Sequence, residues 1–202
     1  MTQEKKTIYH LYRRVLFPNC TLIVQTGAGV AENIHKGDIV LVLPIRTAFD
    51  ILIPWRKTAT MAEVTDISSS DTMYTIVFRG ISRVRIHSVE RFKRGTYSAI
   101  EERGSEDAEH YVELLRKKSQ ELIFLINVEE SDRLIHLLNY LSDLNQFADF
   151  IANYFVMNFQ RRYALLRETD LTKRAEVLLK ILEELIIKMK KKIQEKNEET
   201  GS

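Results

Sequence analysis

The chain has 202 residues, 45% of them hydrophobic and 29% charged, and its formal net charge at pH 7 is only +2. This is the composition of an ordinary globular protein, and the length allows one sizeable domain or two small ones. The near-neutral charge gives no general reason to expect a nucleic-acid partner. No stretch approaches the ~18 consecutive apolar residues of a membrane span, and the N-terminus lacks a secretory signal pattern. The single cysteine, Cys20, cannot form an internal disulfide, which favours a cytoplasmic protein.

Residues 7–103 have the alternation and turn spacing of short β-strands. Residues 8–12 place their side chains on two faces with a period of two, and Pro18 then interrupts the pattern. The continuous apolar run at 39–43 is typical of a strand buried on both faces, and Pro44 is expected to end it. Gly80 is expected to interrupt a later strand, through a bulge or a positive φ. Strands are therefore predicted at residues 8–12, 22–24, 39–43, 59–67, 73–78, 84–89 and 97–100, arranged as a small barrel or sandwich.

Residues 104–202 follow helical spacing instead, after a short polar join at 104–107. Apolar side chains recur on one helical face over residues 111–126, and again over 131–141. A third apolar helix contains residues 147–155, and Ser142 and Asp143 stand where its N-terminal cap is expected. The order of patterns predicts several helices packed side by side.

The last helix is predicted to be long and to begin after Thr169 or Asp170. Either side chain can accept hydrogen bonds from the free N–H groups of the first helical turn. Apolar residues then alternate in steps of four and three, as in a coiled-coil seam: Leu171, Ala175, Leu178, Leu182, Leu185 and Met189. We expect Leu178, Leu182, Leu185 and Met189 to contact a second chain or a following module. The turns after Leu185 are expected to project from the bundle, so that their removal leaves the melting temperature nearly unchanged.

Several segments, taken in this order, resemble the N-terminal domain of Lon proteases. In the first half they are Leu16-Phe17-Pro18 and the segment Phe-Arg-Gly-Ile-Ser-Arg-Val-Arg-Ile at 78–86. In the second half they are Phe-Ala-Asp-Phe-Ile-Ala-Asn at 147–153, Leu-Leu-Arg-Glu at 165–168, and the pattern of Asp, Arg, Glu and Leu residues at 170–182. The resemblance spans about residues 7–195 and is stronger after residue 59. The chain departs from the family at Asn19, where a glycine is usual, and over residues 44–58.

The resemblance implies an α+β fold. Residues 1–103 would form an N-terminal mixed β-sheet or partly open, PUA-like barrel, and residues 104–202 an antiparallel α-helical bundle that ends in the long helix. It also implies a non-catalytic domain that recognises unfolded, damaged or degron-bearing polypeptides for an ATP-dependent protease. The ATPase and Ser/Lys protease modules of such an enzyme would lie outside this chain. An oligomerisation scaffold, a stand-alone adaptor and a small hydrolase are the alternatives.

No residue pattern predicts catalysis, a cofactor or a metal. A phosphate-binding loop needs glycine followed by Lys and Ser or Thr, and no glycine here has that context; residues 27–29 are a lone Gly-x-Gly. The five histidines show no pair at helical spacing and no neighbouring second cysteine, as a zinc site would require. Arg83 and Arg85 are expected on one solvated face of a bulged strand. We therefore expect a chain that is no enzyme and needs no cofactor.

The candidate binding residues lie between residues 44 and 58, a segment with neither strand alternation nor helical spacing. They are the large apolar side chains Phe49, Leu52, Ile53 and Trp55. Such a group is either core or an exposed patch that binds another polypeptide. Because apolar burial requires no fixed partner sequence, an exposed patch here would suit unfolded chains, with affinities in the micromolar range or weaker.

Overall fold

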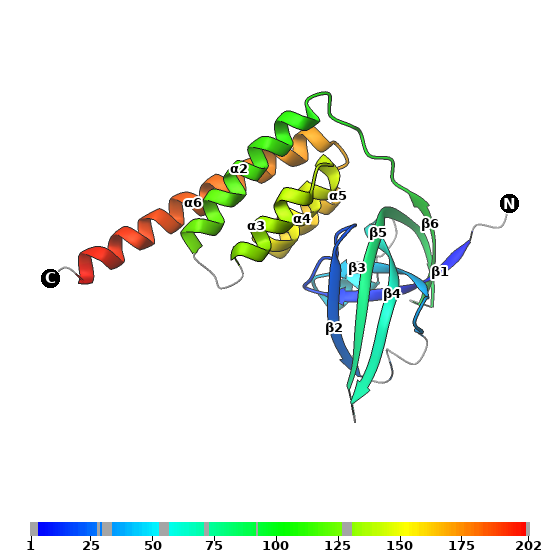
Figure 1. The fold of residues 1–202 in the computed structure, drawn as a ribbon. Coiled ribbons are helices and arrows are strands. Elements are labelled where there is room, and N and C mark those ends of the chain that lie inside the picture. The colour runs from blue at the N-terminus through cyan, green and yellow to red at the C-terminus, as the bar shows by residue number, and fades with distance from the viewer. Residues whose placement is uncertain are drawn as a thin grey trace. The chain divides into compact units, whose positions relative to one another are not determined.

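The computed structural model describes residues 4–27, 29, 34–52, 57–70, 73–91, 93–126 and 131–200 (Figure 1). The chain divides into two compact units. The first, here called the β-unit, comprises Met1–Glu101 and Met157–Thr169. The second, the helical unit, comprises Glu102–Val156 and Asp170–Ser202. Among the described helices, none is long and apolar enough to cross a membrane.

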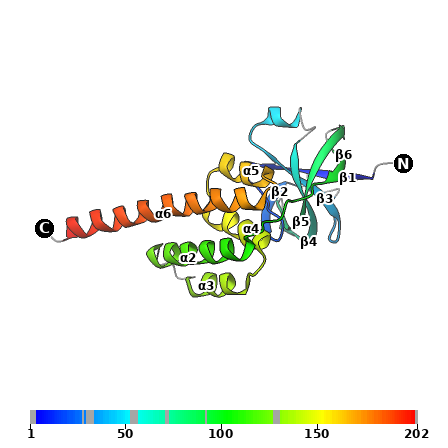
Figure 2. The ribbon, with the colours of Figure 1, turned by 90° about the horizontal axis from the view of Figure 1, so that it is seen from above.

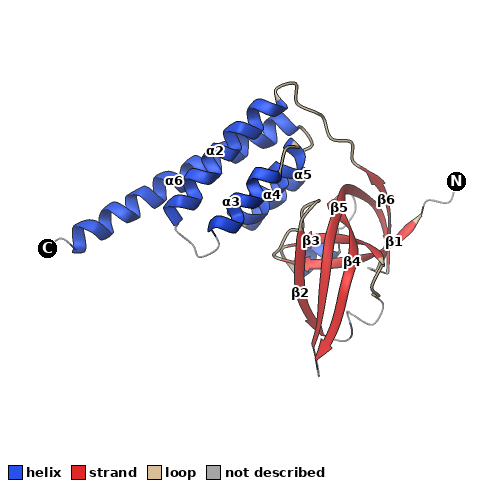
Figure 3. Cartoon of the chain, in the orientation of Figure 1, coloured by secondary structure: helices blue, strands red, loops and turns tan. Residues whose placement is uncertain are grey.

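The β-unit contains a mixed sheet of six described strands, coloured red in Figure 3. The strand order is β2-β5-β4-β3-β1-β6, and β5 also pairs with β6. Among the six described strands, only β1 and β3 pair in parallel. This confirms the predicted mixed sheet, although its strands do not form a clear barrel. The strands are β1 Lys5–Tyr12, β2 Thr21–Gly27, β3 Ile39–Ile45, β4 Thr58–Ser70, β5 Met73–Glu90 and β6 Arg94–Ala99.

Gly80 does not interrupt its strand, contrary to the expectation from sequence. β5 continues through it, with a register shift against β4 between Met61 and Ala62, which confirms the predicted bulge. The reason for a glycine is space and not a positive φ: a Cβ atom at this position would collide with the carbonyl oxygen of Phe17. Two backbone hydrogen bonds hold this approach, from Asn19 N to Gly80 O (3.0 Å) and from Gly80 N to Cys20 O (2.9 Å).

Pro44 does not end its strand either. β3 runs to Ile45, and Pro44 lies opposite Leu11 in the parallel register. β4 pairs with β3 only as far as Val42. Pro44 therefore lies beyond the β3–β4 ladder, and its lack of an N–H costs that ladder no hydrogen bond.

The short helix α5, Phe159–Arg167, belongs to the β-unit, whereas the sequence-based division placed it in the helical half. The Arg83 side chain is only 2% exposed and its Nε donates to Leu166 O at 3.1 Å. That carbonyl lies in the last turn of α5, where main-chain acceptors lack helical partners. Arg162 Nη2 donates to Val15 O at 3.0 Å, and its guanidinium lies over the Phe17 ring. The predicted solvated position of Arg83 is therefore wrong.

The helical unit is built from four described helices, and Figure 2 shows α2 and α6 running alongside each other. Asp143 caps α4 by accepting from Gln146 N at 2.9 Å, and Asp170 accepts from Lys173 N at 3.1 Å at the start of α6. Both predicted caps are thus confirmed. The helices are α2 Ala108–Ile126, α3 Ser131–Tyr140, α4 Leu144–Phe155 and α6 Leu171–Thr200.

α6 stays packed for about one turn beyond Leu185, further than predicted, before its exposed last turns begin. Ile186 is buried, and Lys190 Nζ donates to Glu121 Oε1 of α2 at 2.8 Å. The residues become continuously exposed only from Lys190 to Glu198. The pairing with α2 therefore extends about one turn further than the sequence indicated.

Candidate functional site

A short 3-10 helix between β3 and β4, η1 (Ala48–Ile51), presents apolar side chains to solvent. Ile51 packs against the hydrophobic core of the β-unit. Phe49 is 78% exposed and Leu52, directly after the helix, is 55% exposed. Large apolar side chains with so little burial contribute little to folding, so these two residues are candidates for binding.

Asp50 fixes the conformation of this turn. Its Oδ2 accepts from Arg46 N (2.8 Å) and Thr47 N (2.9 Å). Lys57 Nζ donates to Asp50 Oδ1 at 2.8 Å and to Asp50 O at 3.1 Å. The Lys57 hydrogen bond, followed by the Thr47 amide, holds the pKa of the Asp50 carboxyl well below its usual range. These contacts place Phe49 and Leu52 outward before any partner arrives, which reduces the entropy lost on binding.

Two residues of the predicted apolar patch, Ile53 and Trp55, lie outside the described residues. The patch is therefore seen only at Phe49 and Leu52, and both have the exposure that a binding surface needs. We call these two side chains on their fixed turn the η1 platform.

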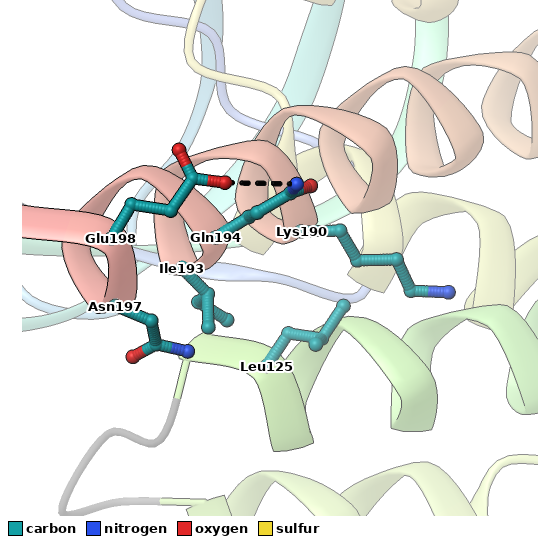
Figure 4. A pocket seen from close by; sticks show the side chains of 6 residues that line it. All are labelled: Leu125, Lys190, Ile193, Gln194, Asn197 and Glu198. Carbon is teal, nitrogen blue, oxygen red and sulfur yellow. Dashed lines mark hydrogen bonds between the residues drawn. The ribbon is translucent and has the colours of Figure 1, made fainter. Parts of the chain in front are cut away.

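A shallow pocket of ≈ 400 Å³ lies in the helical unit, between the ends of α2 and α6 (Figure 4). Its apolar part is formed by Leu125 and Ile193, and Gln194 Nε2 donates to Glu198 Oε1 at 3.2 Å along its rim. The lining residues include no histidine, cysteine, serine or threonine. Over the described part of the chain, no three His, Cys, Asp or Glu side chains gather as metal ligands.

A family model for the ATP-dependent protease La (LON) substrate-binding domain matches residues 7–184. The chain belongs to this family. The resemblance seen in the sequence is thereby confirmed. The family description names a substrate-binding domain, which is a non-catalytic domain.

Two solved structures of LON domains have the same fold. The N-terminal domain of Mycobacterium avium complex Lon protease has a TM-score of 0.70 at 16% sequence identity, with 89% of this chain and 98% of that chain covered. The Lon N-terminal domain protein from Xanthomonas campestris has a TM-score of 0.60 at 17% identity, with 87% and 97% covered. No curated protein sequence matches the chain.

In the β-unit, the key residues of the segments that carried the LON resemblance are buried. Leu16 and Phe17 are buried, and Thr60 Oγ1 donates to Leu16 O at 2.6 Å. Gly80 accommodates the Phe17 carbonyl, and Arg83 binds the end of α5. These residues hold the fold together and do not form an exposed site.

The LON pattern in the helical unit is also internal. Arg174 is fully buried, with Nη2 2.5 Å from Glu102 Oε1 and Nη1 2.8 Å from Asn145 Oδ1. The buried Asp149 carboxylate lies 3.5 Å from the same guanidinium. The charge is thus compensated inside the unit, as a buried ion requires.

The residues predicted to contact a second chain do not form an exposed seam. Leu178 and Leu182 are fully buried within the helical unit, and Leu185 and Met189 are half-buried. α6 makes its principal contacts with α2 and α4. The periodic seam is filled within the chain, so pairing between chains through Leu178 or Leu182 is wrong.

Proposed function

We propose that this LON domain binds unfolded or degron-bearing polypeptides through the η1 platform and delivers them to an ATP-dependent protease. The observation that carries the proposal is the fixed outward presentation of Phe49 and Leu52. The family's role as a substrate-binding domain supports it. The ATPase and protease activities belong to other modules, whether in the same polypeptide or in a partner.

The chemistry of the platform suits clients of varied sequence. Apolar burial is non-directional, so it selects for exposed hydrophobic side chains and not for one sequence. Two side chains remove little area from water, and an unfolded client loses conformational freedom on binding. We therefore expect a dissociation constant in the micromolar range or weaker, which corresponds to about −8 kcal/mol or less in magnitude.

A fluorescently labelled, reduced and carboxymethylated model protein tests this function by anisotropy. Replacing Phe49 and Leu52 together by Ala should weaken binding about tenfold, a loss of about 1.4 kcal/mol, because the apolar contact is removed. The melting temperature should stay unchanged, since both side chains are exposed. The folded form of the same model protein should bind neither variant nor wild type.

Phe124→Ala in α2 is the matched control, because Phe124 is 71% exposed and lies in the helical unit. It should leave the affinity unchanged. Trp55, the single tryptophan, supplies a second readout: its emission should be red-shifted in the free protein and move to the blue when client is added. Equal affinity of wild type and the Phe49/Leu52 double variant would contradict the proposed site.

A further inference from the structure

A second surface of the β-unit is a groove of ≈ 590 Å³ between β1 and β2. Neither strand pairs with the other: β2 is the last strand at one end of the described sheet, and β1 pairs with β6 only over Lys5, Lys6 and Thr7. The groove is therefore bounded by two strand edges. Its lining is Tyr9, His10, Leu11, Tyr12 and Arg14 on one side, and Ile23, Val24, Gln25 and Thr26 on the other.

The open edge of β2 carries backbone hydrogen-bonding groups. Cys20 O accepts from Gly80 N, so Cys20, and with it Leu22 and Val24, direct their backbone groups toward β5. In an antiparallel ladder the residues between them direct theirs to the opposite side. Ile23 confirms this, because its carbonyl accepts from Arg14 Nη1 at 3.0 Å across the groove. The N–H and C=O of Gln25 therefore face the groove, where no described strand pairs with them.

The side chains of the groove combine apolar surface with positive charge. Tyr9, Leu11 and Val24 are buried beneath it. Tyr12 and Ile23 stand on its rim, 55% and 59% exposed. Among the nine lining residues Arg14 carries a positive charge and none is an aspartate or glutamate. A complementary partner therefore has apolar side chains and a carboxylate.

We propose that an extended, acidic polypeptide segment adds as a strand to the open edge of β2, with a carboxylate beside Arg14. Main-chain hydrogen bonds to Gln25 would provide affinity with little dependence on sequence, while alternate side chains of the segment contact Tyr12 and Ile23. The proposal rests on the polypeptide-binding function given above and adds a second site to it. The η1 platform would take apolar side chains, and the groove would take the extended backbone.

A labelled ten-residue peptide of alternating valine and threonine with two glutamates tests the proposal by anisotropy. Gln25→Pro removes an N–H that faces the groove, and proline is tolerated on an edge strand when its nitrogen faces outward. Gln25→Ala keeps that N–H and is the matched control. We expect Gln25→Pro to weaken binding at least tenfold and Gln25→Ala to stay within twofold of wild type. Circular dichroism checks that both variants are folded.

Changes to the peptide keep the test independent of how Gln25→Pro folds. Two analogues N-methylated at alternate residues remove the donors of one peptide edge or the other. At least one should bind wild type tenfold more weakly, because the edge that faces β2 loses its hydrogen bonds. Replacing the two glutamates by lysines should also weaken binding, and Arg14→Gln should reduce that difference between the two peptides.

Equal binding of all methylated and unmethylated peptides would overturn strand addition, as would a folded Gln25→Pro variant with wild-type affinity. Together with the client-binding experiment on the Phe49/Leu52 variant, these measurements distinguish failure of the groove from failure of the η1 platform. If the Phe49/Leu52 variant loses client binding while the Gln25 variants and the methylated peptides show no effect, the η1 platform is retained and the groove is rejected. Failure of wild type to bind either probe would reject both.

Discussion

At the scale of single residues, the close approach of the Phe17 carbonyl to Gly80 predicts the effect of a substitution. Gly80→Ala should lower the free energy of unfolding by about 1–3 kcal/mol, because the added Cβ meets the Phe17 carbonyl and main chain must move. Chemical denaturation of the two purified proteins measures the difference.

Gly104→Ala is the matched control for this substitution. A Cβ at Gly104 has open space around it and its φ is not positive, so the change should be within about 1 kcal/mol of wild type. Equal stability of the two variants would mean that the strand accommodates a side chain at residue 80 by a small backbone shift.

At the residue scale, one short turn also contains residues that stabilise the fold and a residue that we propose for binding. Ile51 packs on the core, Asp50 accepts the hydrogen bonds that fix the turn, and Phe49 is exposed. From the sequence, Phe49 was identifiable only as part of an apolar group without a period, together with Leu52, Ile53 and Trp55. Which of them face solvent depended on the position of the turn beside β3 and β4, which local spacing does not encode.

At the scale of elements, the length of α6 that stabilises the helical unit can be measured by truncation. Ending the chain after Leu185 removes buried Ile186 and the Lys190–Glu121 ion pair. Loss of a buried isoleucine side chain costs about 2–5 kcal/mol, so the melting temperature of the helical unit should fall by several degrees. Circular dichroism at 222 nm follows the transition.

Ending the chain after Gln194 is the control truncation. It removes only residues whose described side chains are exposed, and the melting temperature should stay within about 2 °C of the full chain. An unchanged melting temperature after the Leu185 truncation would show that the last turns of α6 contribute nothing to the unit. The sequence alone predicts that outcome, because local spacing does not reveal the burial of Ile186.

At the scale of the whole molecule, the β-unit is assembled from two separate stretches of the chain. Leu165 and Leu166 of α5 are buried, α5 contacts β4, and Arg83 and Arg162 bind backbone carbonyls between the two stretches. Residues 1–101 alone would therefore leave apolar surface and the Arg83 guanidinium without these contacts. We expect this fragment to unfold without a cooperative thermal transition.

Joining residues 157–169 to residue 101 through a flexible glycine–serine linker should restore a cooperative transition. The same linker without the helix is the control, and amide hydrogen exchange over residues 80–86 reports the contact with α5 directly. If the two fragments melt alike and exchange alike, α5 is dispensable to the β-unit.

The sequence alone determined the type and order of most elements, because these depend on local pattern. Helical spacing predicted α2, α3 and α4, and short oxygen-bearing side chains at Asp143 and Asp170 located two helix starts. The motif segments indicated the LON family because buried close contacts, such as that of Gly80 with Phe17, restrict residue type strongly. Helical spacing, capping and close packing each restrict the residue type at a given position, so they can be recognised in the sequence.

Only the tertiary structure decided which side chains and strand edges are buried and which are exposed. A seam at Leu178 and Leu182 has the same spacing whether it meets another chain or α2 and α4, and the structure buries it inside. Pro44 remains in its strand because β4 stops pairing at Val42. The groove beside Gln25 exists because β1 and β2, though consecutive, do not pair. Burial, strand edges and the packing of α5 into the β-unit all depend on contacts between residues far apart in the chain. Such contacts leave no periodic pattern in the local sequence.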